Sequence, residues 1–232
     1  NQHTMKITIL GSGMVGQVLA SKCIELGHEV WMATRDPETT KARTEPNPMS
    51  GISFTAWYAK VPEVHLCAFG EVPADSDLLI NATAGVISLK ALETVGQAKL
   101  DGKTLLDLAN PLDFSKGMPP TLTVCNTDSL GEQIQRTYPS TKVVKGLNTL
   151  NCQVMVAPEM VPGEHQVFIC GNDADAKTVV NSLLHEMGWP DSRILDLGGI
   201  EASRGTEMLL PFWMSLMGSL GTAVMNYKIE KP

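Results

Sequence analysis

The stretch ILGSGMVG, Ile9–Gly16, places glycines at positions 11, 13 and 16. It follows an apolar run, KITIL, which predicts a buried strand, and it leads directly into MVGQVLASKCIELG, Met14–Gly27, which has an apolar stripe at helical spacing. Glycines in this spacing between a strand and a helix are typical of a dinucleotide-binding turn, because they permit a tight turn, a close approach to pyrophosphate and close helix packing. We therefore predict a phosphate loop made of Gly11, Ser12, Gly13, Met14 and Val15.

Strand-like and helix-like segments alternate along the rest of the chain. This alternation predicts an α/β fold with a Rossmann-type, doubly wound parallel sheet covered on both faces. Helices are expected from about Pro37, from about Ser129, after a cap at Asp173, and from Ile200 onward. Further strands are expected at residues 28–34, 77–83, 103–110, 141–150, 165–171 and 192–199, and the short segment 65–69 is ambiguous.

Two parts of unequal size follow from this pattern. We expect residues 5–150 to form a nucleotide-binding core, and residues 151–232 to form a small C-terminal strand and helix extension packed on that core. The four residues before Met5 are left out of the prediction because they precede the first strand.

The composition is that of an ordinary globular protein. The chain has 232 residues, of which 43% are hydrophobic and 19% charged, and its net charge of -7 indicates no nucleic-acid partner. The five cysteines form no C-x-x-C pair, so we expect buried thiols in a reducing compartment and no metal site. No signal peptide is evident, and a cytoplasmic location is expected.

One uncharged stretch requires a membrane test. Met208–Met225, MLLPFWMSLMGSLGTAVM, only just reaches the length of a spanning helix, and a proline, two glycines and three hydroxyl residues dilute it. We interpret it as a buried or subunit-facing helix and expect no membrane partner.

The end of the second expected strand, MATRDP, indicates which dinucleotide the turn binds. NAD-binding proteins place a carboxylate about twenty residues past the glycines, where it binds the adenosine ribose. Here that place holds Thr34, followed by Arg35. A hydroxyl and a guanidinium suit a 2′-phosphate, which a carboxylate would repel, so we predict NADP as the cofactor. Asp36 either reaches the ribose or caps the next helix, and Lys41 either contacts the phosphate or is solvated.

Several segments together resemble one family. They are KITILGSGMVGQVLASKCIELGHEVWMATRDP, INATAG, LLDLANPLDF, KGLNTL and VFICGNDADAK. These segments resemble the NADP oxidoreductases that depend on the deazaflavin coenzyme F420, a family whose domain is also similar to the cytoplasmic reductase part of the STEAP ferric reductases. The resemblance covers nearly the whole chain, and it is most specific in the order of TRDP, ANP and KGLNTL.

The resemblance implies that NADP lies across the strand ends. Its nicotinamide would lie near residues 81–85, 109–112 and 146–149, in agreement with the rule that ligands bind outside the carboxyl ends of parallel strands. Pro111 either contacts the cofactor or only fixes the turn, and Asn148 either binds the nicotinamide ribose or satisfies nearby backbone. The candidate contacts are Thr83, Ala84, Asn110, Pro111 and Asn148.

A proton donor for the reduction of a carbonyl or imine is not evident, and catalytic residues stay unassigned. We interpret His28, His65, His165 and His185 as surface or packing residues. Lys145 is the best candidate acid, although its place in a strand could direct it to solvent. A missing acid fits a flavin or deazaflavin acceptor, because the ring itself carries the chemistry and the protein needs only to align two rings.

We therefore expect an NADP-dependent oxidoreductase that moves a hydride between NADP(H) and a deazaflavin, a flavin or a similar small-molecule redox acceptor. The alternatives are a reductase of a small carbonyl, imine or ferric complex, and a non-catalytic NADP-binding redox sensor. A homodimer is also expected. The segment 199–217 would form core or dimer interface, or would contribute Arg204, Phe212, Trp213 and Met217 to the acceptor site.

Overall fold

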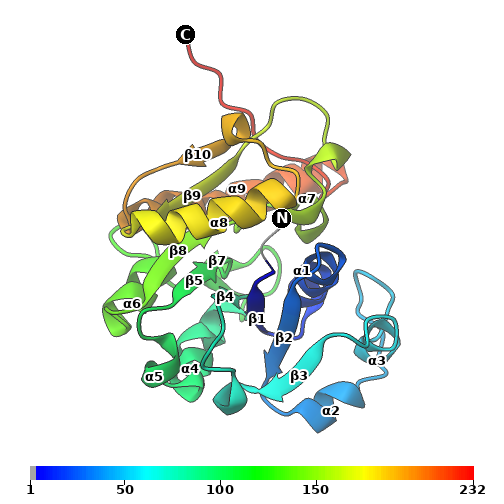
Figure 1. The fold of residues 1–232 in the computed structure, drawn as a ribbon. Coiled ribbons are helices and arrows are strands. Elements are labelled where there is room, and N and C mark those ends of the chain that lie inside the picture. Colours follow the sequence, from blue (N-terminus) through cyan, green and yellow to red (C-terminus); the bar gives the residue numbers. More distant parts are fainter. Residues whose placement is uncertain (1–3) are drawn as a thin grey trace.

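An eight-stranded sheet organises the fold, with the strand order β10-β9-β8-β5-β4-β1-β2-β3 (Figure 1). The computed structural model describes residues 4–232, so residues 1–3 of the excluded N-terminal stretch lie outside the described part. The strands of the sheet are β1 (Lys6–Leu10), β2 (Glu29–Thr34), β3 (His65–Ala68), β4 (Leu78–Asn81), β5 (Thr104–Asp107), β8 (Lys142–Gly146), β9 (Val167–Gly171) and β10 (Ile194–Asp196). A separate two-stranded ladder pairs β6 (Leu112–Asp113) with β7 (Thr121–Leu122).

Strand β1 lies between β2 and β4 and runs parallel to both. Ile7 is opposite Val30 on β2 and opposite Leu78 on β4. From β1 the chain first builds β2 and β3 on one side, and then crosses back to build β4, β5 and β8 on the other. The strand order reverses at β1, and ligands of such sheets bind outside the carboxyl ends of the strands at this point. The predicted doubly wound α/β fold is confirmed.

Strand β9 runs antiparallel to β8, which differs from the fully parallel sheet that the alternation predicted. Val144 on β8 is opposite Gly171 on β9. A parallel return needs a crossover, usually a long helix. The connection 147–166 contains only the short α7 (Cys152–Val156) and a 3-10 turn (Pro158–Met160), so the chain re-enters the sheet from the end at which β8 leaves it.

Nine α-helices connect and cover the strands within the described residues. The predicted cap at Asp173 is present, since its side chain accepts a hydrogen bond from the backbone N–H of Ala176. The helix expected from about Ser129 begins there, and the Ser129 side chain accepts from the backbone N–H of Glu132. Besides α7, the helices are α1 (Met14–Glu25), α2 (Pro37–Lys41), α3 (Phe54–Tyr58), α4 (Gly85–Val95), α5 (Gln97–Leu100), α6 (Leu130–Thr137), α8 (Ala174–Glu186) and α9 (Ser203–Leu220).

Two clusters of buried apolar side chains lie on opposite faces of the sheet. One joins Ile9 of β1 to Leu19 of α1 and Leu183 of α8. The other joins Leu79 of β4 to Leu92 of α4 and also includes residues of α6. Because both faces are covered, the central strands are nearly continuous apolar runs in the sequence.

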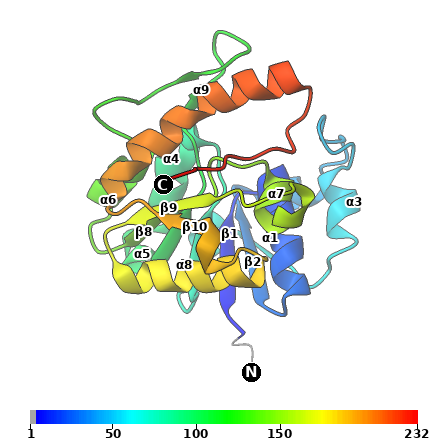
Figure 2. The ribbon, with the colours of Figure 1, turned by 90° about the horizontal axis from the view of Figure 1, so that it is seen from above.

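Helix α9 lies on the face of the sheet opposite α8 (Figures 1 and 2). After α9 the chain continues without regular structure to the C-terminus, and the backbone N–H of Gln166 donates to the carbonyl of Tyr227 at 2.9 Å. The final segment is therefore tied to the residues that lead into β9. Across residues 4–232, none of the helices has the length and apolar character needed to cross a membrane.

Candidate functional site

The glycine loop between β1 and α1 is open where the sequence predicts a ligand. Gly11 has a φ of 112°, and a Cβ on it would lie 2.6 Å from the carbonyl oxygen of Ala82. A Cβ on Gly16 would lie 2.3 Å from the carbonyl oxygen of Gly11, so the third glycine lets α1 approach the loop. A Cβ on Gly13 would meet nothing within 4 Å, and no side chain caps the helix there. The first N–H groups of α1 therefore face open space at the positive end of the helix.

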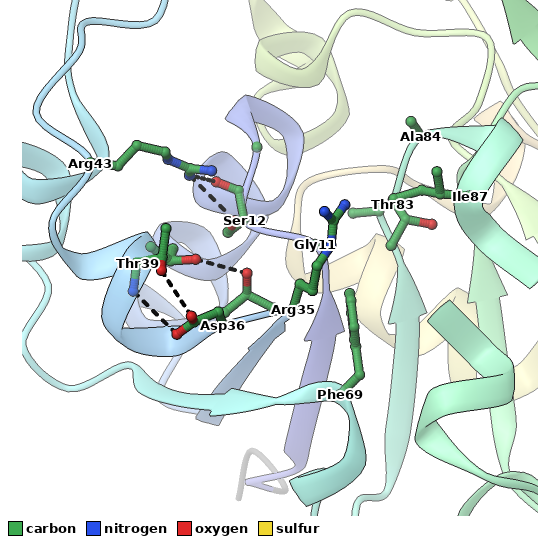
Figure 3. Close-up of a pocket in the computed structure, with 14 residues that line it drawn as sticks. Gly11, Ser12, Arg35, Asp36, Thr39, Arg43, Phe69, Thr83, Ala84 and Ile87 are labelled. Carbon is green, nitrogen blue, oxygen red and sulfur yellow. Dashed lines mark hydrogen bonds between the residues drawn. The ribbon is translucent and has the colours of Figure 1, made fainter. Parts of the chain in front are cut away.

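A cavity of about 420 Å³ lies beside this loop (Figure 3). Its walls come from the glycine loop, the end of β2, α2, the segment after β3, and the start of α4. Of the predicted contacts, Met14, Val15, Asn110, Pro111 and Asn148 lie outside this lining. The lining consists of Gly11, Ser12, Gly13, Thr34, Arg35, Asp36, Thr39, Thr40, Arg43, Phe69, Ala82, Thr83, Ala84 and Ile87.

The residues that end β2 have distinct roles. The Thr34 hydroxyl is buried and lies 2.8 Å from the hydroxyl of Thr40. The Asp36 carboxylate caps α2, accepting from the backbone N–H of Glu38 at 3.0 Å and from the hydroxyl of Thr39 at 2.8 Å. Hydrogen bonds from Thr39 also lower the pKa of Asp36. Of the two roles open to Asp36, the structure therefore has the cap.

Arg35 is exposed and lines the cavity. Among the described residues, its guanidinium has no hydrogen bond or ion pair within the chain, so its planar set of donors is free for a ligand. Lys41, by contrast, forms an ion pair with Glu38 at 3.1 Å and is not part of the lining.

A second guanidinium, that of Arg43, lines the same cavity and lies beside Ser12 (Figure 3). It donates to the carbonyl oxygen of Ser12 at 2.7 Å. Its central carbon, Cζ, lies 5.0 Å from the ring centroid of Phe54. Arg43 is not among the residues predicted from the sequence, because it follows the short helix α2 and not the end of a strand. Its charge was the available signal, since a lysine and two arginines occur between residues 35 and 43.

Buried polar side chains occupy the ends of β4 and β5. The hydroxyl of Thr83 donates to the Asn81 side chain at 2.6 Å and lies 2.8 Å from the hydroxyl of Ser88. The Asn81 amide donates in turn to Asp107 at 2.9 Å. Thr83 thus touches the cavity while its hydroxyl is fixed from within the protein.

Asn110 and Asn148 bind each other across the ends of β5 and β8. The Asn110 amide donates to the carbonyl oxygen of Asn148 at 2.9 Å, which fixes the orientation of its side chain. The Asn148 amide then donates to Oδ1 of Asn110 at 3.0 Å. As a result, the buried Oδ1 of Asn148 is left without a hydrogen-bond partner among the described residues. A buried acceptor of this kind fits a ligand that donates a hydrogen bond.

The β4 and β5 loops are in direct contact. Gly85, the first residue of α4, lies so close to Asn110 that a Cβ on Gly85 would be 2.0 Å from the Asn110 carbonyl oxygen. The carbonyl of Pro111 accepts from the backbone N–H of Thr123 at 2.8 Å. Pro111 is therefore held in the turn that follows β5. The polar side chains at the ends of the parallel strands β4, β5 and β8 lie close together.

The residues considered as proton donors all lie outside the cavity lining. Lys145 is fully buried and forms ion pairs with Asp107 and Glu207, so it does not point to solvent. His28 is held by Glu186, and His185 by Asp191. The other two histidines have structural environments as well, since the His65 ring lies against Trp31 and the His165 ring is buried.

The cavity thus offers two guanidinium groups and the amino end of a helix, which is an arrangement suited to a ligand with several phosphates. The buried acceptor of Asn148 lies at the ends of the neighbouring strands, outside the lining of this cavity. The two regions together have the chemistry that a dinucleotide requires.

Comparison with known proteins identifies the family. The family model described as NADP oxidoreductase coenzyme F420-dependent matches residues 6–111, which contain the glycine loop, both arginines and the β4 and β5 loops. A relative named Metalloreductase STEAP3, from Rattus norvegicus, is 27% identical over 227 residues, which are 96% of this chain and 41% of that protein. The F420-dependent NADP reductase of Methanocaldococcus jannaschii is 30% identical over 145 residues, covering 60% of this chain and 64% of that protein.

The chain therefore spans less than two thirds of the length of either of these curated relatives. A crystal structure from Arthrobacter sp. FB24, described as a "putative f420 dependent nadp-reductase", matches more completely. It is 52% identical with a TM-score of 0.91, and the match covers 98% of this chain and 100% of that one. By this full-length match and the matching family model, the chain belongs to the family of coenzyme F420-dependent NADP oxidoreductases.

Proposed function

We propose that this protein is an oxidoreductase that transfers a hydride between NADP(H) and a deazaflavin, a flavin or a similar redox acceptor, in the cytoplasm. The observation that carries the proposal is the pair of guanidinium groups, Arg35 and Arg43, in the cavity beside the glycine loop. Both positive charges face the place where the adenosine end of a dinucleotide lies in such sheets.

The residues that follow β2 favour NADP over NAD. A carboxylate free to bind the ribose hydroxyls is the usual mark of an NAD site. Here the Asp36 carboxylate is occupied by the first turn of α2, whereas the Arg35 guanidinium is free. An arginine presents several donors in a fixed plane and keeps its charge at all physiological pH values, which suits a 2′-phosphate. The buried Thr34 hydroxyl would support this site mainly through its contact with Thr40.

The remaining contacts follow the course of the dinucleotide. The open side of Gly13 and the N–H groups of Ser12, Met14 and Val15 would bind the pyrophosphate at the start of α1. The nicotinamide half would lie along Thr83, Ala84, Asn110 and Pro111, and the free Oδ1 of Asn148 would accept a hydrogen bond from it. Bound NADPH supplies the hydride, and the chain's own residues hold its two ends in a fixed orientation.

A flavin-like acceptor is favoured by the environments of the candidate proton donors. Lys145 and His28 are engaged in ion pairs. The polar side chains proposed for the nicotinamide half, Thr83, Asn110 and Asn148, are not usual acids. A conjugated ring needs alignment more than a proton donor from the protein. The names of two relatives, F420-dependent NADP reductase and the crystal structure of similar description, support a deazaflavin as the first acceptor to test.

The C-terminal extension, residues 151–232, is proposed to provide the acceptor site, a homodimer interface, or both. Met208, Phe212 and Leu220 on α9 are exposed apolar side chains, and such a surface is typical of an interaction site. Trp213 lies on the same helix, and its buried Nε1 has no hydrogen-bond partner among the described residues. Light scattering on the purified protein would test the dimer directly, since a monomer at micromolar concentration would refute it.

The cofactor is tested by measuring the affinities of NADPH and NADH for the wild type, Arg35→Ala and Lys41→Ala. We expect the wild type to prefer NADPH, and Arg35→Ala to lose about tenfold to a hundredfold in NADPH affinity, as expected for hydrogen bonds to a charged group, with little change for NADH. Lys41→Ala should behave like the wild type, because Lys41 is paired with Glu38 outside the cavity. A wild type that prefers NADH would refute the assignment.

The acceptor is tested by following NADPH oxidation anaerobically with deazaflavin, flavins, quinones and ferric chelates. We expect turnover with the deazaflavin or a flavin. Turnover with a ferric chelate alone would support the alternative of a metal reductase, in line with the name of the STEAP3 relative. Tight NADPH binding without oxidation by any acceptor would point instead to a redox sensor.

A further inference from the structure

A buried ion cluster lies below the carboxyl ends of β5 and β8. The Lys145 ammonium is 2.7 Å from Oδ2 of Asp107 and 3.0 Å from Oε1 of Glu207, and it donates to the carbonyl of Ala109 at 2.6 Å. The side chains of Lys145 and Asp107 are 0% exposed and that of Glu207 is 2% exposed. The ammonium therefore has three close oxygen neighbours, a carbonyl that accepts a hydrogen bond and two carboxylates that form ion pairs with it.

On one side, the cluster holds the loop that carries Asn110. Ala109, which accepts from Lys145, is the residue directly before Asn110. Asp107 accepts from the backbone N–H of Ala109 at 3.1 Å and from the Asn81 amide at 2.9 Å. A displacement of the ammonium would therefore move the backbone that presents Asn110 to Asn148.

On the other side, the cluster holds the C-terminal helix. Glu207 belongs to α9, and its carboxylate accepts from the backbone N–H groups of Leu130 at 2.9 Å and Gly131 at 3.2 Å, at the start of α6. A Cβ on Gly131 would lie 2.8 Å from the hydroxyl oxygen of Ser203 and 3.2 Å from Cε of Lys145. The missing side chain of Gly131 thus lets α6, α9 and Lys145 meet closely.

Lys145 is poorly placed to act as an acid. Burial by itself lowers the pKa of Lys145, but the Asp107 and Glu207 carboxylates outweigh burial and raise the pKa above its ordinary value. The ammonium thus keeps its proton at neutral pH, and it is separated from the cavity lining. A charge that is buried, paired with two carboxylates and linked to two structural units is suited to positioning rather than to proton transfer.

We propose that Lys145 and Glu207 are positioning residues that couple the C-terminal helix α9 to the nicotinamide half of the site. The position of α9 then sets the position of the Ala109–Pro111 loop, through Glu207 and the Lys145 ammonium. This inference rests on the proposed function, because it assumes that NADP(H) binds with its nicotinamide beside Asn110 and Asn148.

The proposal predicts that a change in the cluster affects the binding of the two halves of the cofactor differently. The adenosine half would be bound by Arg35, Arg43 and the glycine loop, none of which contacts the cluster. Loss of the Glu207 charge should therefore leave the binding of the adenosine half unaffected and should weaken the binding of the nicotinamide half.

The test compares Glu207→Gln with Glu132→Gln as a matched control. Glu132 also ties α6 to α9, through two hydrogen bonds with Arg204 at 2.9 Å and 2.7 Å. Among the described residues, the ion pairs of Lys145 are with Asp107 and Glu207 and not with Glu132. In the control, Arg204 keeps its ion pair with Glu201 at 3.1 Å. The probes are adenosine 2′,5′-bisphosphate for the adenosine half, NADPH for the whole cofactor, and the fluorescence of bound NADPH for the surroundings of the nicotinamide.

We expect Glu207→Gln to bind adenosine 2′,5′-bisphosphate within about twofold of the wild type, to bind NADPH at least about fivefold more weakly, and to shift the emission of bound NADPH. Glu132→Gln should leave all three unchanged. If Glu207→Gln does not fold, Glu207→Asp keeps the charge, shortens its reach and should act in the same direction with a smaller effect. Equal effects of the glutamine variants at positions 207 and 132, or no change in NADPH binding and emission, would overturn the proposal. Failure of the wild type to bind either probe would refute the proposed function instead, and the inference with it.

Discussion

The Arg43 guanidinium donates to the carbonyl oxygen of Ser12 at 2.7 Å, which joins the segment after α2 to the glycine loop. The same carbonyl accepts from the Gln17 amide of α1 at 2.9 Å. Arg43 therefore has two effects at once. It holds the backbone of the loop in place, and it brings a positive charge to the wall of the cavity.

Replacement of Arg43 by methionine should lower the affinities for both NADPH and NADH by about fivefold. This factor is equivalent to about 1 kcal/mol, as expected for one lost hydrogen bond. The loop that Arg43 holds binds the part that both dinucleotides share, so this variant differs from Arg35→Ala, which should discriminate between them. Isothermal titration with each cofactor measures the effect. A loss confined to NADPH would mean that Arg43 binds the 2′-phosphate rather than the loop.

The contact between the β4 and β5 loops leaves no room for a side chain at Gly85. A Cβ there would lie 2.0 Å from the carbonyl oxygen of Asn110, and the atoms that it would meet belong to the backbone of Asn110 and Pro111. Gly85→Ala should therefore lower the free energy of unfolding by about 1–3 kcal/mol and weaken NADPH binding. Gly205→Ala is the control, because a Cβ in that helical position meets nothing within 4 Å. This variant should raise the free energy of unfolding by about 0.5–1 kcal/mol. Urea unfolding of both variants measures the difference.

The unpaired Oδ1 of Asn148 gives a direct test of the nicotinamide half. Asn148→Ala should lower the affinity for NADPH by about tenfold, because a hydrogen bond to the cofactor is lost and the partner side chain of Asn110 is disturbed. The affinity for adenosine 2′,5′-bisphosphate should not change. Asn151→Ala serves as the control, since the Asn151 side chain caps α7 by accepting from the backbone N–H of Gln153. That variant should lose stability without losing affinity. Equal affinities of Asn148→Ala and the wild type would remove Asn148 from the site.

The sequence was sufficient to predict the parts of the fold that depend on local pattern. The glycine spacing, the apolar strands, the helix start near Ser129 and the cap at Asp173 are all short-range features, and each is present. The direction of β9 was not predictable in this way. An apolar strand has the same composition in either direction, and only the lack of a long crossover helix between β8 and β9 decides its orientation.

The site was predictable in part for a similar reason. Arg35 follows a strand at a known distance from the glycines, whereas Arg43 reaches Ser12 only because α2 is short and turns the chain back. The environment of Lys145 depends on Glu207, which is far away in the sequence. The place of Lys145 in a strand left a solvent-facing side chain open, and only the fold, which covers both faces of the sheet, puts this lysine beside buried carboxylates.

Lys145→Met should be strongly destabilising. The substitution leaves the carboxylates of Asp107 and Glu207 in the protein interior without their ammonium, and removal of one partner of a buried ion pair costs about 3–5 kcal/mol. Lys90→Met is the control, because Lys90 and Glu93 form a pair on the surface with side chains 78% and 66% exposed. We expect little change there. Denaturant unfolding at neutral pH measures both, and a loss for Lys145→Met no larger than that of the control would contradict the buried-cluster interpretation.

His165 should make the stability of the fold depend on pH. Its ring is buried, its Nε2 lies 3.0 Å and 2.9 Å from the carbonyl oxygens of Pro158 and Val161, and its Nδ1 lies 2.8 Å from the Asn226 amide of the final segment. Burial, followed by the neighbouring Arg193 guanidinium, lowers the pKa of His165 below 6.5. The hydrogen bonds with the carbonyl groups of Pro158 and Val161 raise the pKa, but they do not offset this lowering.

A lowered pKa in the folded state means that the unfolded chain binds the proton more readily. The contribution of His165 to stability is therefore complete above pH 6.5, and it is lost as the pH falls from 6.5 through the pKa of the folded state. Urea midpoints measured at about pH 7.5 and about pH 5.5 should fall more steeply in the wild type than in His165→Gln, whose amide does not titrate. His65→Gln, at an exposed ring against Trp31, should retain the wild-type pH dependence. A His165→Gln protein with the full wild-type slope would show that the loss of stability arises at another group.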